Sequence, residues 1–253
     1  MMATSELASQ QPPPADPQDL SQRAHRIVIG VLGCILPPVL YVVAGLRETV
    51  GLTPWVRLNS ISAYYYTGAV GIFVGVIFAL SLFLLTYRGY AGVWVDRIVG
   101  GLAGLAALGV VLFPTRPPES VQPPDWWSEA AGHLHYVSAV VLFLCFIVFA
   151  VWLFRRSSVP KRSDRPSAKQ WRDHICLACG VAMAIGVVWA GICLLTGDDS
   201  IFYPETLAIE AFAVSWLAKG EAHAPLVELV RRRGLQRRAR MKQIDPSTGK
   251  PHA

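Results

Sequence analysis

The stretch Thr67–Thr86, TGAVGIFVGVIFALSLFLLT, contains no charged side chain. A helix crosses the hydrocarbon core of a bilayer with about 20 predominantly apolar residues, so this stretch is long enough to span a membrane. Only 16% of the chain is charged, against roughly 25% in a soluble domain. Five other apolar stretches accompany the first: Ile27–Leu46, Ile98–Pro114, Leu134–Phe154, Ile175–Thr196 and Ile201–Leu217. The sequence therefore predicts an all-α polytopic membrane protein, a six-transmembrane-helix bundle.

The basic residues orient these helices, because cytoplasmic loops of membrane proteins carry an excess of lysine and arginine. The chain has 23 basic residues, and all but Arg47, Arg57 and Arg116 fall in segments that share one side of the predicted membrane. The N- and C-termini are therefore predicted to be cytoplasmic. Tyrosine and tryptophan are expected at both interfaces. The sequence places Trp55, Tyr64, Tyr65, Tyr66, Trp126, Trp127 and Tyr203 outside, and Tyr87, Tyr90, Trp94, Trp152, Trp171 and Trp216 inside.

Two polar segments flank the membrane domain, which we assign to residues 23–220. Residues 1–22 are rich in Gln, Pro and Ser and are predicted to be a disordered N-terminal leader. We expect no cleaved signal peptide, because the first apolar run is long enough to span and starts late. Residues 221–253 form a basic cytoplasmic tail that includes Arg231, Arg232, Arg233, Arg237, Arg238 and Arg240. Beside a membrane, such a tail favours contact with anionic lipid headgroups over nucleic-acid binding.

Small residues and prolines indicate how the helices pack. Glycine or alanine recurs every four residues at Gly71 and Gly75, at Gly100 and Gly104, at Ala103 and Ala107, and at Ala182, Gly186 and Ala190. In lipid, such faces let helices approach closely, so we expect them to mark contacts within the chain. Pro37-Pro38 should kink the first helix, because proline removes a backbone donor. The kink either opens a cavity toward the outer leaflet or is simply tolerated.

The cysteines and Asp96 are interpreted as structural. All five cysteines lie within apolar spans, which excludes a secreted disulfide framework. Cys176 and Cys179 form a C-x-x-C, which we interpret as two small apolar residues one turn apart. A metal role would need more ligands nearby, and the sequence predicts no metal or other cofactor. Asp96 is expected to complement the N-terminal dipole of the third span.

Most polar residues that could carry chemistry lie toward the predicted outer side. Their side chains come from separate segments and could converge on one outward-facing pocket. His133 and His135 are about 200° apart around a helix, so they cannot both ligate one metal. One of them with Glu205 and Asp198 stays an alternative metal site. The catalytic candidates are His133, His135, Glu205, Ser60 and Ser62, and the ligand-binding candidates are Tyr64, Tyr65, Asp198 and Glu210.

Glu210 differs from the others because it lies deeper in the membrane. It follows Ile201 by nine residues, which is roughly 14 Å at the helical rise and near the midplane of the bilayer. Carboxylates there usually face the bundle interior. Glu210 is interpreted either as a proton-carrying or ligand-binding group, or as a protonated acid that hydrogen-bonds between helices.

Several motifs resemble those of a family of bacterial six-helix membrane proteins of unknown function. They are Ser60-Ile61-Ser62-Ala63-Tyr64-Tyr65-Tyr66, Phe73-Val74-Gly75, Tyr87-Arg88-Gly89-Tyr90, Leu112-Phe113-Pro114-Thr115, the His133/His135 region, and Ala211-Phe212-Ala213-Val214-Ser215-Trp216-Leu217-Ala218-Lys219-Gly220. The resemblance covers roughly Ser60 to Glu221. It implies that Glu205 matches an acidic position of the family's last helix, whereas Glu210 departs from the pattern. It also implies a bacterial plasma membrane as the location.

A weaker likeness links the chain to intramembrane lipid hydrolases of the alkaline-ceramidase and adiponectin-receptor type. That family is expected to have seven helices and a zinc held by histidines. This chain has six predicted spans and no H-x-x-x-H in its last helix, so it departs from the zinc pattern.

Three functions are consistent with these patterns. The first is a non-enzymatic protein that interacts with membrane lipids or has a regulatory role, and the sequence favours it over an enzyme. The second is a hydrolase that acts on lipid at the outer leaflet, with or without a metal. The third is a proton-coupled carrier that uses Glu210, although carriers usually show internal repeats. Membrane lipids are the expected partners, and no protein partner is indicated.

Deletion of residues 231–241 should weaken binding of the protein to vesicles that contain anionic lipid. Each basic residue near such a surface contributes about 1 kcal/mol, and salt screens this attraction. The loss should therefore be larger at low salt. Vesicle co-sedimentation at two salt concentrations measures it, and equal binding of both proteins at low salt would contradict the prediction.

Overall fold

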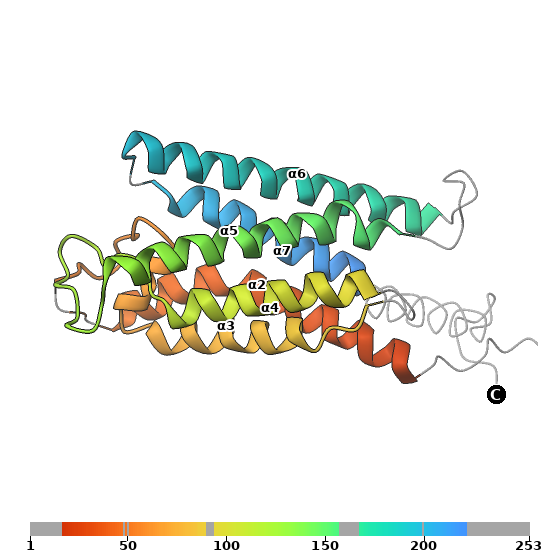
Figure 1. Cartoon of the computed structure of the whole chain (residues 1–253), viewed down its shortest axis with the longest axis horizontal. Coiled ribbons are helices and arrows are strands. Elements are labelled where there is room, and N and C mark those ends of the chain that lie inside the picture. The colour runs from red at the N-terminus through yellow and green to blue at the C-terminus, as the bar shows by residue number, and fades with distance from the viewer. Residues whose placement is uncertain are drawn as a thin grey trace, which may run out of the picture.

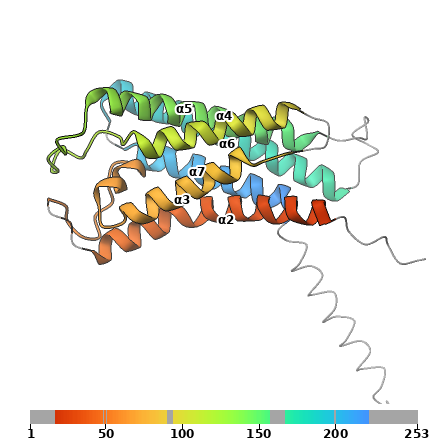
Figure 2. The same cartoon turned by 60° about the horizontal axis from the view of Figure 1, so that its bottom comes forward.

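The fold is an antiparallel bundle of helices whose axes run along one common direction (Figures 1 and 2). The computed structural model describes residues 17–47, 49, 51–89, 94–156, 167–198 and 200–221. Within them lie the α-helices α2 (Pro17–Leu46), α3 (Val70–Leu85), α4 (Trp94–Leu112), α5 (Glu129–Val151), α6 (Ser167–Thr196) and α7 (Phe202–Lys219). Two short 3₁₀ helices, η1 (Ser62–Tyr66) and η2 (Leu153–Arg155), complete the described elements. The prediction of an all-α fold is confirmed.

Four of the helices are long and apolar enough to cross a membrane: Ser21–Leu46 within α2, Trp94–Leu112, Glu129–Arg155 and Ser167–Thr196. The shorter helix α3 has 16 residues, and α7 contains Glu205 and Glu210. The outer surface of the bundle carries large apolar side chains such as Leu195, Val188 and Leu112, which are 89%, 62% and 67% exposed. Water-soluble proteins rarely expose apolar surface on this scale. The apolar helices and the exposed apolar surface therefore indicate a membrane-embedded protein.

The boundaries follow the predicted spans, with differences at the helix starts. Helix α2 begins at Pro17, inside the segment predicted to be a disordered leader, and residues 1–16 lie outside the described residues. It continues through Pro37-Pro38 to Leu46 without interruption. Helix α3 begins at Val70, three residues after the predicted start, because residues 67–69 form a turn after η1. The basic tail lies outside the described residues.

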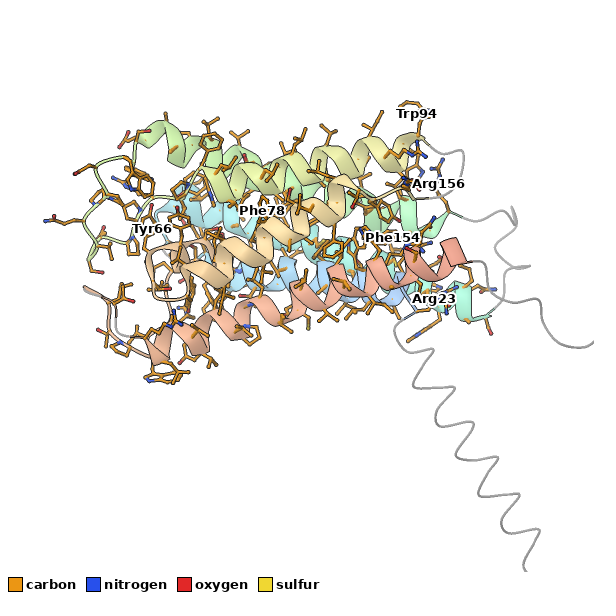
Figure 3. The ribbon with its side chains drawn as sticks, turned by 90° about the horizontal axis from the view of Figure 1, so that it is seen from below. Arg23, Tyr66, Phe78, Trp94, Phe154 and Arg156 are labelled. Carbon is orange, nitrogen blue, oxygen red and sulfur yellow. The ribbon has the colours of Figure 1, made fainter. Side chains whose placement is uncertain are left out.

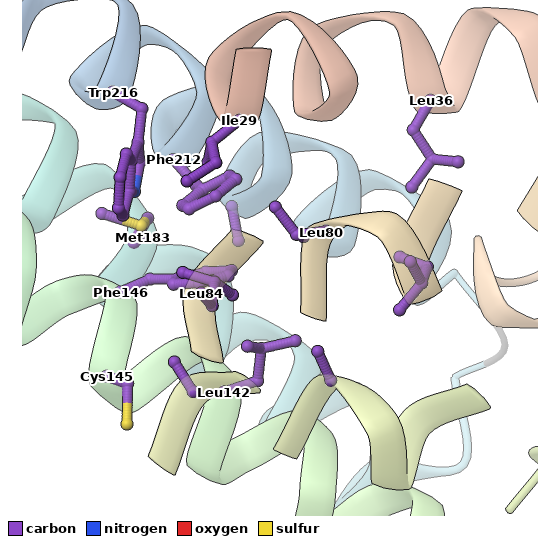
Figure 4. Packing of buried hydrophobic residues seen from close by; sticks show 14 of the residues in the cluster. Ile29, Leu36, Leu80, Leu84, Leu142, Cys145, Phe146, Met183, Phe212 and Trp216 are labelled. Atoms are coloured by element: carbon purple, nitrogen blue, oxygen red, sulfur yellow. The ribbon is translucent and has the colours of Figure 1, made fainter. Parts of the chain in front are cut away.

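Aromatic side chains in the core join two layers of helices, one formed by α2, α7 and α6 and the other by α3, α4 and α5. Helix α7 packs against α2 and α6, whereas α4 packs against α3 and α5. Phe146 of α5 and Phe212 of α7 stack with their ring centroids 3.7 Å apart (Figure 4). Trp216 is fully buried and contacts Tyr87 and Phe149 edge-on or tilted, at 5.2 and 5.3 Å between centroids. These rings fix α7 against the other layer.

The aromatic residues at the two ends only partly follow the sequence prediction. Trp55, Trp126 and Tyr203 are exposed at one end, and Trp94, Trp152 and Trp171 are exposed near the other. Tyr64, Tyr87 and Trp216 are instead buried in the core, with exposed fractions of 1%, 5% and 0%. The depth of a residue along the membrane normal does not say whether its side chain faces lipid or core.

The small residues mark close helix contacts in two of the three predicted helices. A Cβ at Gly100 would lie 3.0 Å from the Leu84 carbonyl oxygen of α3, and a Cβ at Gly186 would lie 2.8 Å from the Pro204 carbonyl oxygen of α7. Glycine therefore permits these approaches. The prediction is wrong for Gly71 and Gly75, because a Cβ at either position would meet no described atom within 4 Å.

Gly186→Ala should destabilise the bundle, whereas Gly191→Ala on the same helix should not. The added methyl at position 186 meets the Pro204 backbone, and overpacking typically costs about 1–3 kcal/mol. At Gly191 the methyl meets nothing within 4 Å, and alanine is the better helix former. Thermal unfolding in mild detergent measures both variants. An equal midpoint for Gly186→Ala and the unmodified protein would contradict the packing described.

Candidate functional site

A short non-helical segment at one end of the bundle carries the first of the candidate residues. Residues 58–61 lead into η1, and the Ser60 hydroxyl accepts a hydrogen bond from the Ala63 amide at 3.0 Å. Serine often provides such a local acceptor at the start of a helical turn. The Thr67 hydroxyl donates to the Tyr64 carbonyl at 2.8 Å and closes the other end of η1. Ser60 and Thr67 therefore stabilise the two ends of this turn through local hydrogen bonds.

Glu205 holds this segment against α7. Its carboxylate accepts a hydrogen bond from the Ile61 amide at 2.6 Å, and the Ser62 amide faces the same carboxylate. The Phe202 amide donates to the Asn59 carbonyl oxygen at 2.6 Å. Glu205 also lies in the first turn of α7, where a negative charge is stabilised by the helix dipole. The carboxylate therefore satisfies backbone donors that lipid cannot satisfy.

His135 of α5 lies on the other side of Ser62. Its Nε2 atom is 3.0 Å from the Ser62 Oγ atom, and the side chain is 2% exposed. Its Nδ1 atom is 2.8 Å from the Phe113 carbonyl oxygen and 3.1 Å from that of Val110. Carbonyl oxygens only accept hydrogen bonds, so Nδ1 carries the proton of the neutral ring. Nε2 is then the acceptor, and the Ser62 hydroxyl donates to it.

The three residues thus form a serine flanked by a histidine and a carboxylate from different helices. An imidazole that accepts the proton of a serine hydroxyl is the arrangement that activates serine as a nucleophile. The two carbonyl oxygens hold the ring in the required tautomer, a role that a carboxylate fulfils in the usual triad. The Ser62 amide faces the Glu205 carboxylate, and not an open position where an oxyanion could form. The same hydrogen bonds also tie η1 to α5 and α7.

A cavity of about 60 Å³ lies inside the bundle below this cluster. Ser62 and Glu205 are at its wall, and the rest of the lining is almost entirely apolar, including Leu36, Leu80, Leu142, Phe146 and Phe212 (Figure 4). Gly33 also lines it, and Pro37 leaves the Gly33 carbonyl without its helical donor. Ligand pockets are typically apolar with a few polar groups that orient the ligand. The cavity has this composition.

A larger cleft of about 850 Å³ opens at the predicted outer end of the bundle, on the other side of the same segment. Its wall includes Ser60 and Ala63, together with Arg57 and Arg116. The Arg57 guanidinium lies over the rings of Tyr203 and Phe202, at 4.4 and 5.1 Å. This segment therefore separates the two hollows: Ile61 and Ser62 border the cavity, whereas the cleft is bordered by Leu58, Asn59, Ser60 and Ala63.

The remaining outer candidates do not join the cluster. His133 is exposed, and its Nδ1 atom is 2.8 Å from the Glu129 carbonyl oxygen. Asp198 is exposed and its pKa is lowered by hydrogen bonds from Ser200. Across residues 17–221, leaving aside the masked positions, no three His, Cys, Asp or Glu side chains are grouped to hold a metal ion. The alternative metal site of one histidine, Glu205 and Asp198 is therefore wrong, because helix rotation and the loop keep these side chains apart.

The two tyrosines proposed as ligand-binding residues pack as structural groups. Tyr64 is 1% exposed and lies against the Phe202 ring at 6.4 Å between centroids. Tyr65 contacts Tyr66 and Phe73 edge-on. The Tyr66 hydroxyl donates to the Thr115 carbonyl oxygen at 2.6 Å, and burial raises the pKa of Tyr66. Figure 3 shows Tyr66 at the end of the bundle opposite to Trp94 and Arg156.

Glu210 and the two cysteines of the C-x-x-C lie away from the cluster of Ser62, His135 and Glu205. Glu210 is half-buried and contacts the thiol of Cys34 on α2, and it does not line the cavity. Cys176 and Cys179 are buried free thiols, as the interpretation of two small apolar residues requires. Asp96 is buried in the first turn of α4 and also forms an ion pair with Arg156, 3.6 Å away.

Sequence reasoning missed two parts of the site. The carbonyl oxygens of Val110 and Phe113 orient His135, and no side-chain pattern could have indicated them. Arg57 and Arg116 line the outer cleft. Their signal was present, because they are two of the three basic residues predicted on the outer side.

A family model described as "Protein of unknown function (DUF998)" matches residues 61–218. The match begins within the segment that borders the cavity and ends near the last turn of α7. No curated protein and no solved structure matches the chain.

Glu205→Gln should loosen the segment that contains Ser62. The amide of glutamine has one acceptor oxygen and a donor NH₂ group, so one of the two backbone amides would face a donor. A buried donor left unpaired costs about 1–3 kcal/mol. Hydrogen exchange of a peptide covering residues 58–66 should therefore quicken by roughly fivefold or more. Glu210→Gln is the matched control on the same helix, and equal exchange in both variants would contradict the capping role.

Proposed function

We propose that this chain, which belongs to the family described as "Protein of unknown function (DUF998)", is an integral membrane protein that binds a membrane lipid at its outer end. The acyl chain of the lipid would enter the apolar cavity, and its headgroup would lie in the outer cleft. This proposal adds a binding site to the non-enzymatic, lipid-interacting or regulatory role that the sequence favours. The cavity beneath Ser62 and Glu205 is the observation that carries the proposal.

The proposal includes six membrane crossings with both termini in the cytoplasm of the plasma membrane. Helices α3 and α7, with 16 and 18 residues, would be roughly 24 and 27 Å long. Both are slightly shorter than a hydrocarbon core of about 30 Å, and a mismatch of this size costs only fractions of a kcal/mol per Å. Helix α7 also packs between α2 and α6, so its carboxylates need not face lipid. The distribution of basic residues supports the orientation.

The composition of the cavity supports a chain-like apolar ligand. Phe73 and Leu80 of α3 and Leu142 of α5 are each at most 5% exposed, and all line the cavity. An apolar chain would gain about 25 cal/mol per Å² of surface removed from water. Ser62 and Glu205 would mark the depth at which the polar part of the ligand begins.

The outer cleft supports a lipid with an anionic headgroup. Arg57 and Arg116 line it from separate loops, and arginine is suited to phosphate because its guanidinium donates two parallel hydrogen bonds. Arg57 is already positioned over Tyr203 and Phe202. The basic tail would add contacts with anionic lipid headgroups at the cytoplasmic face.

A second candidate function is hydrolysis of a lipid ester, favoured by the hydrogen bond from Ser62 to His135. The Ser62 oxygen would attack the ester carbonyl while His135 Nε2 takes the hydroxyl proton. His135 would return this proton to the departing alcohol, and water would then release the acid from the acyl-serine. We rank lipid binding first because the Ser62 amide, a common oxyanion donor, faces the Glu205 carboxylate.

Ala139→Phe should expel the bound lipid, because the added ring fills part of the cavity that Ala139 lines. Val140→Phe is the matched control, since Val140 is the next residue and is 49% exposed on the outside of the bundle. Native mass spectrometry of protein purified in mild detergent measures the bound mass. We expect lipid on the unmodified protein and on Val140→Phe, and at least tenfold less on Ala139→Phe. No lipid on any of them, or equal lipid on all three, would overturn the binding proposal.

A fluorophosphonate probe tests the hydrolase candidate separately. An activated serine should react with the probe, and the modification should map to Ser62. Labelling should be lost in Ser62→Ala and fall by at least tenfold in His135→Gln, whereas Ser60→Ala should label normally. Absence of labelling at Ser62 in the folded, unmodified protein would rule out a nucleophilic role, and would leave lipid binding unaffected.

A further inference from the structure

We propose that the opposite end of the bundle holds a second site, which binds a phosphate group. A cavity of about 110 Å³ lies there between α2, α6, α7 and η2. Four basic side chains line it: Arg26 from α2, Lys169 and Arg172 from α6, and Lys219 from α7. On the orientation proposed above, the site faces the cytoplasmic leaflet, about the length of the bundle away from Ser62.

Two of the cations are held next to each other by one oxygen atom. Lys219 Nζ is 2.9 Å and Lys169 Nζ is 3.2 Å from the Phe154 carbonyl oxygen in η2. This carbonyl lies at the end of the α5–η2 segment, where a negative partial charge attracts cations. Two ammonium groups that share one acceptor repel each other in a partly buried place. An anion in the adjoining cavity would relieve this repulsion.

The carboxylates at this site are fewer than the basic groups. Lys169 pairs with Asp173, and Glu221 pairs with both Arg172 and Arg23. Among the described residues, five cationic side chains therefore surround two carboxylates. The side chains of Lys169 and Arg172 are only 15% and 21% exposed, so water and salt screen their charges less than on an open surface.

The arrangement matches phosphate better than a smaller anion. Arginine and lysine from three helices approach from different directions, and a tetrahedral phosphate offers an acceptor oxygen to each. The cavity has room for several water molecules and hence for a phosphate group. Basic pockets between membrane helices on the cytoplasmic side are known to hold lipid headgroups. The phosphate could therefore belong to a lipid headgroup or be a free phosphate ion, and the experiment separates these sources.

The full-length protein is purified in mild detergent and titrated with phosphatidic acid, phosphatidylcholine or inorganic phosphate. Native mass spectrometry counts the bound lipid, and thermal unfolding reports on the inorganic ion. Arg172→Gln and Lys219→Gln remove one cation each from the cavity. Arg88→Gln and Arg97→Gln are matched controls, because they remove an exposed arginine near the same end of the bundle. Lys219→Arg and Arg172→Lys keep the charge and show whether a loss follows from charge or from folding.

We expect one tightly bound phosphatidic acid on the unmodified protein and the controls, weakened at least fivefold by either glutamine substitution and largely restored in the charge-keeping variants. Stabilisation by inorganic phosphate, lost in the same variants and without selective lipid binding, would assign the site to the free ion. If phosphatidic acid and phosphate bind the pocket variants and the controls equally, or if neither binds the unmodified protein, the proposal is overturned.

Discussion

The end of the bundle that contains η1 depends on the pairing of backbone groups that do not belong to any α-helix. Inside or beside a bilayer, an unpaired amide costs several kcal/mol, so a non-helical segment persists only where other groups satisfy it. Glu205 accepts a hydrogen bond from the Ile61 amide, and the Asn59 carbonyl oxygen accepts one from the first amide of α7. The segment from Asn59 to Ser62 is consequently fixed to α7, and Ser62 is placed against His135. The cavity wall and the cleft wall both follow from this attachment.

The two ends of the molecule have opposite chemistry. At the predicted outer end, Ser62 and Glu205 border an apolar cavity, and His135 is hydrogen-bonded to Ser62. At the other end, lysines and arginines from three helices border a small polar cavity. Between them the stacked rings of Phe146 and Phe212 and the buried Trp216 fill the bundle. A lipid bound at each end would therefore be held by different forces, mainly burial of apolar surface outside and charge inside.

The sequence alone predicts the helices well, because apolar runs of membrane length have few alternative structures. It also selects Ser62, His135 and Glu205 as candidates by residue type and predicted depth. It cannot choose between His133 and His135, since the rotation of α5 decides which of them faces inward. Similarly, Trp216 and Tyr87 were assigned to the interface by depth, but they face the core. The basic cavity was hidden for the same reason: Arg26, Lys169 and Lys219 are far apart in the chain and meet only in the folded bundle.

The most direct test of the central claim is photo-crosslinking with a phospholipid that carries a diazirine near the end of one acyl chain. The protein is reconstituted in nanodiscs, irradiated and digested, and the modified residues are identified by mass spectrometry. We expect adducts on buried cavity residues such as Phe73, Ile77 and Leu142, which are 2%, 7% and 5% exposed. Adducts confined to outward-facing residues such as Val140 and Leu144, 49% and 51% exposed, would show that the chain stays outside the bundle and would contradict the central claim.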